Sequence, residues 1–259
     1  MPGNRRLRRG IYLLPTTFTV GNLCCGFVSL VLSSRGEYSL AGFTIILAGI
    51  LDGLDGRIAR LTGSTSEFGV EFDSLADVVS FGVAPAFLAY QWALLPLRRG
   101  GWLIAFLYVV CAAMRLARFN LQSSTQDKRY FAGLPSPSAA GTIACSAFAF
   151  PILPQGRLPA VLVALVVVTV ATLMISRVRY RSFRNLGLGS RRPYFYALLI
   201  AAVLVGILAH PRGTLMGLAI AYVLSAPAVW LFGWLRRGSA RPGAQPSEPP
   251  EVADEPALR

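Results

Sequence analysis

Long apolar stretches separated by short polar segments run through most of the 259-residue chain. A helix needs about 20 mostly apolar residues to cross the roughly 30 Å hydrocarbon core of a bilayer. Stretches of that length predict helices near residues 16–34, 38–56, 70–95, 101–118, 137–155, 158–176, 193–210 and 213–235. The pattern therefore predicts an all-α fold, a polytopic integral membrane bundle of about eight transmembrane helices.

The composition supports this interpretation. Hydrophobic residues make up 54% of the chain, charged residues make up 14%, and the mean hydropathy is +0.55. A water-soluble domain normally has a more polar composition. We expect residues 13–237 to form one transmembrane domain whose first helix is retained rather than cleaved as a signal peptide. Residues 1–12 interleave arginines with apolar side chains, which predicts an amphipathic segment on the cytoplasmic membrane surface. Residues 238–259, rich in proline and acidic residues, predict a disordered cytoplasmic tail.

The net charge of +13 raises the question of nucleic acid binding, and the positions of the basic residues answer it. With the N-terminus inside and eight spans, 20 of the 25 lysines and arginines fall on the same side of the membrane. Cytoplasmic loops carry such an excess of positive charge. We therefore expect a multi-pass protein of the cell membrane with both termini in the cytoplasm. The basic loops would set the topology and contact anionic lipids, and no nucleic acid partner is expected.

Acidic residues gather in one short window. Outside the predicted tail the chain has eight of them, and six lie between residues 52 and 77. A carboxylate in or near hydrocarbon costs roughly 3 kcal/mol or more, so this window predicts a functional site. Asp52 and Asp55 are three residues apart, and Asp73 and Asp77 are four apart, so each pair shares one face of a helix. Oxygen ligands without histidine or cysteine favour Mg²⁺ or Mn²⁺ over zinc, and two such ions could clamp a diphosphate.

The residues around the aspartates leave room for a ligand. Gly56 and Ala59 keep bulky side chains off the helix surface, Arg60 offers a cation to a diphosphate, and Gly69 lies one turn before the second acidic pair. Any one of these small residues is equally well explained by helix packing, whereas the whole set at this spacing favours a binding site. Asn22, in a polar stripe of the first predicted helix, either faces this site or makes an ordinary hydrogen bond between helices.

Residues 52–77 follow the pattern D-x-x-D-G-x-x-A-R-x8-G-x-x-x-D-x-x-x-D, which resembles the signature of the CDP-alcohol phosphotransferase family. The resemblance implies a site for two divalent ions, Mg²⁺ or Mn²⁺, held by four aspartates: Asp52, Asp55, Asp73 and Asp77. It implies that Asp77 is also the catalytic base that deprotonates the acceptor hydroxyl. It implies a CDP-binding surface formed by Gly56, Ala59, Arg60 and Gly69. Homodimers are common in the family, and a homodimer is expected here for that reason.

Flanking stretches resemble the serine-using branch of the family, the phosphatidylserine synthases. They are IYLLPTTFTVGNLCCGF at 11–27, SFGVAPA after the last aspartate, RLARFN at 115–120 and FAGLPSPSAAG at 131–141. This resemblance implies transfer of the phosphatidyl group from CDP-diacylglycerol to L-serine at the cytoplasmic face. Guanidinium groups pair with carboxylates in a bidentate manner, so a serine site is expected at Arg115, Arg118, Asn120 and Ser136. Either arginine could instead be an anchor that faces lipid.

Other functions fit parts of the pattern. The same chemistry with glycerol 3-phosphate or an inositol phosphate as acceptor would call for more cationic residues in the pocket. An intramembrane prenyltransferase also pairs aspartates with Mg²⁺ and a diphosphate, but it lacks the G-x-x-A-R that follows Asp55 here. A cation-coupled transporter would also bury carboxylates, usually near the midplane of broken helices and with an internal repeat. The aspartates of this chain cluster at one predicted membrane face instead.

Overall fold

The computed structural model describes residues 4–62, 67–122, 130–153, 156–176, 179–181 and 193–238. Nearly all of them are helical. The predicted tail lies outside the described residues, except for Gly238 at the end of the last helix. The elements, in chain order, are α1 (Asn4–Ser34), α2 (Tyr38–Thr62), α3 (Glu67–Asp77), η1 (Val78–Val83), α4 (Ala84–Ala89), η2 (Tyr90–Leu94), η3 (Leu95–Leu97), α5 (Arg99–Gln122), β1 (Tyr130–Ala132), α6 (Ser136–Ala149), α7 (Arg157–Ile175), β2 (Arg179–Arg181), α8 (Pro193–Ala209) and α9 (Pro211–Gly238).

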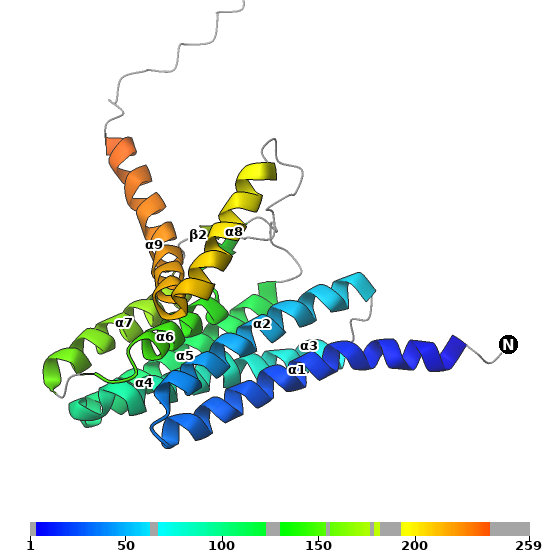
Figure 1. Ribbon diagram of the computed structural model, residues 1–259, viewed down its shortest axis with the longest axis horizontal. Helices are drawn as coiled ribbons and strands as arrows, with labels where there is room; N and C mark the ends of the chain where they lie inside the picture. The colour runs from blue at the N-terminus through cyan, green and yellow to red at the C-terminus, as the bar shows by residue number, and fades with distance from the viewer. Residues whose placement is uncertain are drawn as a thin grey trace, which may run out of the picture.

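The helices form one bundle with an angled pair above it. Figure 1 shows α1, α2, α5 and α7 running along the bundle, while α8 and α9 form a V that rises away from it. Among the described residues, a small two-stranded antiparallel sheet departs from the predicted all-α fold: three residues of β1 pair with three of β2. Residues 4–12, predicted as a surface segment, are helical and continue into the first span as part of α1.

Within the described residues, five helical segments are long and apolar enough to cross a membrane: Thr17–Ser34, Tyr38–Ile58, Phe68–Leu97, Arg99–Leu121 and Arg157–Ile175. They correspond to five of the predicted spans and indicate a membrane-embedded protein. The predicted total of about eight is not confirmed. Helices α6 and α8 have 14 and 17 residues, which at 1.5 Å per residue gives only about 21 and 26 Å. Helix α9 has 28 residues, but its side chains are described only for 211–225.

The third span changes its helical geometry directly after the acidic helix α3. Here η1 is π-helical, and Pro85 lies in the first turn of α4. Proline has no N–H and its ring displaces the carbonyl four residues earlier, which belongs to Phe81. The buried Tyr108 hydroxyl of α5 donates a hydrogen bond to that carbonyl at 3.1 Å. A side chain of the neighbouring helix therefore satisfies the backbone group that the proline releases.

Small side chains let the helices approach closely. One buried cluster, built around Tyr108, joins α5, α6 and α7, and a second, built around Phe81, joins α2, α4 and α6. Alanines contribute much of both clusters. Where α1 meets η1, a Cβ added at Gly26 would collide with Ser80. Helices that lack large side chains at their contacts bring their backbones together, as is usual in membrane bundles. This places α1 directly against the start of η1, next to the acidic helix.

Candidate active site

Three of the four aspartates lie together. Asp52 of α2 and Asp73 and Asp77 of α3 each offer a carboxylate oxygen, and these oxygens all lie within 4.8 Å of one another. The two α3 residues are one helical turn apart and share a face. All three carboxylates are half-buried. The structure thus turns the acidic faces of α2 and α3 toward each other.

The fourth aspartate lies beside this cluster. Asp55 is only 6% exposed, and it accepts a hydrogen bond on Oδ2 from the Thr19 hydroxyl of α1. It is close enough to Asp52 and Asp73 for a direct electrostatic interaction. One of its two oxygens is therefore engaged by a neutral donor, and its charge adds to that of the other three carboxylates.

Asp77 also accepts a hydrogen bond from α1. The side-chain nitrogen Nδ2 of Asn22 donates to Asp77 Oδ1 at 3.1 Å, and Asn22 is completely buried. The Ser80 hydroxyl in turn donates to the backbone carbonyl of Asn22 at 3.0 Å. The sequence left two roles open for Asn22, and the structure combines them, because its interhelical hydrogen bond is made to a site aspartate.

The residues present fit a divalent cation. Two oxygens on opposite sides of one Mg²⁺ lie about 4.2 Å apart, and adjacent ligands lie closer. The three gathered carboxylate oxygens all lie within 4.8 Å of one another, so a small shift would let them share an ion. Among the described residues, the buried oxygens Asp73 Oδ1 and Asn22 Oδ1 accept no hydrogen bond. Buried acceptors without a partner are rare. Asp73 belongs to the carboxylate cluster, and Asn22 is bonded to Asp77 of the same cluster. A hard, oxygen-binding cation would supply the missing positive charge.

The arginine side chain of Arg115 lies near the aspartates. The guanidinium of Arg115, on α5, donates from Nη1 to the Ser136 hydroxyl at 2.6 Å. It also interacts electrostatically with Asp77. Its Nε is buried and donates to no group in the described part of the chain. The structure therefore brings two predicted serine-site residues together and leaves one donor of the arginine available.

The turn before α6 fixes the position of Ser136. Gly133 has a φ of 86°, a conformation that L side chains rarely adopt, and an added Cβ would collide with the carbonyl oxygen of Met174. The next backbone N–H, of Leu134, donates to the Leu173 carbonyl at 3.0 Å. The chain is thus attached to the end of α7 immediately before it enters α6.

The other predicted site residues are spread around this centre. Arg118 is half-buried one turn after Arg115, and Asn120 is exposed and donates to the Ser74 hydroxyl of α3 at 2.9 Å. Gly56 and Gly69 are half-buried on α2 and α3. The backbones of Ala59 and Arg60 belong to α2, whereas their side chains lie outside the described residues.

Helix α9 contributes a polar side chain, Tyr222, that no sequence motif indicated. The Tyr222 hydroxyl is hydrogen-bonded to Ser138 of α6, and Tyr222 interacts electrostatically with Arg115. The available signal was a tyrosine in the apolar stretch 213–235, with no motif around it. Thr19, three residues before Asn22 in the same predicted helix, had no motif of its own either.

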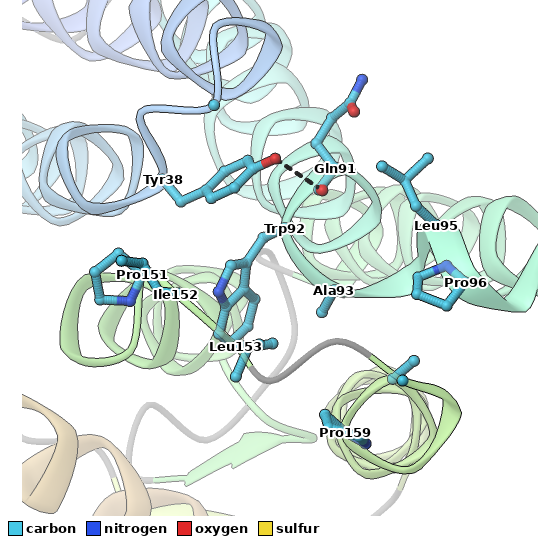
Figure 2. A pocket seen from close by; sticks show the side chains of 13 residues that line it. Tyr38, Gln91, Trp92, Ala93, Leu95, Pro96, Pro151, Ile152, Leu153 and Pro159 are labelled. Atoms are coloured by element: carbon cyan, nitrogen blue, oxygen red, sulfur yellow. Dashed lines mark hydrogen bonds between the residues drawn. The ribbon is translucent and has the colours of Figure 1, made fainter.

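A separate cavity of about 380 Å³ lies far from the aspartates. Tyr38, the first residue of α2, lines this cavity and lies about 21 Å along the helix from Asp52. Figure 2 shows the Tyr38 hydroxyl bonded to the backbone carbonyl of Gln91 at 3.0 Å, with Trp92 beside them. The described residues that line it include no carboxylate. This cavity is therefore not the candidate active site.

The family model for CDP-alcohol phosphatidyltransferases matches residues 12–175, which include all four aspartates, Arg115 and Ser136. The chain belongs to the CDP-alcohol phosphatidyltransferase family.

Among known proteins, the chain is 35% identical over 225 residues to a CDP-diacylglycerol–serine O-phosphatidyltransferase of Helicobacter pylori, covering 86% of this chain and 92% of that protein. It is 38% identical over 176 residues to an archaetidylserine synthase of Methanothermobacter thermautotrophicus, covering 67% and 72%. It is 32% identical over 172 residues to a CDP-diacylglycerol–serine O-phosphatidyltransferase of Bacillus subtilis, covering 66% and 92%.

Proposed function

We propose that this protein transfers the phosphatidyl group of CDP-diacylglycerol to L-serine, giving phosphatidylserine and CMP. The observation that carries the proposal is the convergence of three carboxylates from α2 and α3, with the Arg115 guanidinium beside them. The names of the relatives from Helicobacter pylori and Bacillus subtilis support serine as the acceptor.

In the proposed mechanism, Asp77 accepts the proton of the serine hydroxyl. The serine oxygen forms a bond to the lipid-side phosphorus, the bond between that phosphorus and the bridging diphosphate oxygen breaks, and CMP leaves with the electron pair. Two divalent ions, held by Asp52, Asp55, Asp73 and Asp77, would neutralise the charge of the diphosphate when bound. Arg115 pairs with the carboxylate of serine, which orients the hydroxyl toward the phosphorus.

We place the site at the cytoplasmic side, since L-serine and CMP are water-soluble and most basic residues belong to that side by the charge pattern. Gly56, Ala59, Arg60 and Gly69 would border the CDP moiety, and Arg118 and Asn120 would complete the serine pocket. A homodimer remains part of the proposal through the family resemblance.

The test is release of CMP by the purified protein in detergent with CDP-diacylglycerol and Mg²⁺ or Mn²⁺. L-serine, glycerol 3-phosphate, an inositol phosphate and no acceptor are compared. We expect turnover with serine alone, and its loss in Asp73→Asn, which removes a charged ligand while preserving size. Turnover with another acceptor would refute the serine assignment and retain the chemistry. Absence of CMP under every condition would refute the enzyme and favour a transporter.

A further inference from the structure

Helix α1 contacts both helices that carry the aspartates, α2 and α3. It directs two buried polar side chains at them, Thr19 and Asn22, which lie one turn apart and are 3% and 0% exposed. Thr19 donates to Asp55 on α2, and Asn22 donates to Asp77 on α3. A single helix thus holds one carboxylate of each acidic pair.

These hydrogen bonds define which oxygens stay available. A carboxylate has two oxygens and can rotate about its terminal torsion, so one fixed donor selects the orientation. Thr19 engages Oδ2 of Asp55 and Asn22 engages Oδ1 of Asp77, which leaves the opposite oxygen of each for a ligand. Both donors are uncharged. They therefore orient the carboxylates without neutralising the negative charge that attracts a cation.

The supporting residues are themselves fixed. Ser80 bonds to the Asn22 carbonyl at 3.0 Å, and the close packing at Gly26 holds α1 against the same serine. A hydrogen-bond donor on a well-packed backbone stays in place whether or not a metal ion is bound. It can therefore hold a carboxylate in a fixed orientation.

We propose that α1 is the positioning element of the metal site, with Thr19 and Asn22 orienting Asp55 and Asp77 for divalent cations. This inference rests on the proposed function, because it requires the aspartates to bind metal. Partners of metal ligands commonly change metal affinity by about 10- to 100-fold when they are removed.

The experiment measures Mn²⁺ binding to the purified protein in detergent by electron paramagnetic resonance, without CDP-diacylglycerol or serine. Thr19→Val keeps the shape of the side chain and removes the donor, and it should weaken binding by about 10- to 100-fold. Thr19→Ser keeps the donor and loses a methyl group, and it should retain the parental affinity. A role in packing alone would give the opposite order, since the valine fills the site better than the serine.

Two further variants complete the design. Ser29→Ala removes another buried α1 hydroxyl and should leave the affinity unchanged. This hydroxyl donates to the Ala41 carbonyl at 3.0 Å and lies away from the aspartates. Asn22→Leu tests the second contact independently and should also weaken Mn²⁺ binding. Parental affinity in both Thr19→Val and Asn22→Leu overturns the positioning role while leaving the metal site intact. Failure of the unaltered protein to bind Mn²⁺ overturns the metal site and this inference together.

Discussion

Replacing Arg115 with lysine tests the proposed serine pocket most directly. The arginine donates from Nη1 to Ser136 at 2.6 Å, and its buried Nε remains without an acceptor in the described part of the chain. The guanidinium can therefore bind Ser136 and a substrate carboxylate at the same time. Lysine keeps the positive charge, but its single nitrogen cannot reproduce the planar fork.

The expected change in the KM for serine follows from the hydrogen bonds that are lost. A hydrogen bond to a charged group contributes about 1.5–3 kcal/mol. At about 1.4 kcal/mol for each factor of ten, this predicts a KM for serine raised by about 10- to 150-fold in Arg115→Lys. Ser136→Ala removes only the partner of Nη1 and leaves the guanidinium in place for the substrate carboxylate, so it should raise the KM by less than Arg115→Lys does. The KM for CDP-diacylglycerol should stay constant in both.

Initial rates of CMP release at varied serine and CDP-diacylglycerol give both constants. Arg99→Lys is the matched control, because it makes the same change about 24 Å away at the other end of α5. It should leave both constants at the parental values. A raised KM for CDP-diacylglycerol with an unchanged KM for serine would refute the reasoning and assign Arg115 to the diphosphate.

Two predictions concern the framework around the site, and both are measured by thermal unfolding in detergent. Gly133→Ala should lower stability by at least about 1–2 kcal/mol, because it combines a positive φ with a collision at Met174. Gly141→Ala, where an added Cβ meets nothing within 4 Å, should not destabilise the protein, and equal losses in the two variants would contradict the argument. Tyr108→Phe should cost about 1–3 kcal/mol by leaving the buried Phe81 carbonyl without its donor, and an unchanged melting temperature would show that another group satisfies this carbonyl.

Local periodicity predicted the features that depend on one helix at a time. Five predicted spans match helical segments of sufficient length, because hydrophobic length alone decides whether a helix can cross a bilayer. The stretch near 137–155 contains the expected helix, but α6 ends at Ala149, before Phe150 and Pro151. Proline cannot continue the hydrogen-bond pattern of a helix, so the apolar stretch there is longer than the helix.

For the acidic pairs too, the sequence predicted which residues share a helix face but not how their oxygens are arranged. Spacings of three and four residues place Asp52 with Asp55 and Asp73 with Asp77, whatever the rest of the fold. The spacing does not say which oxygens converge. In the structure Asp52, Asp73 and Asp77 form the compact group, and Asp55 is turned toward Thr19.

The sequence by itself determined the helical membrane architecture, the acidic window and the family signature, since each is written in consecutive residues. The tertiary structure decided which distant side chains complete the site. Thr19 precedes Asp55 by 36 residues, Asn22 precedes Asp77 by 55, and Tyr222 reaches the Arg115 region from α9. Such contacts depend on how helices rotate and cross when they pack, and those angles come from the fit of complete helix surfaces rather than from any local pattern.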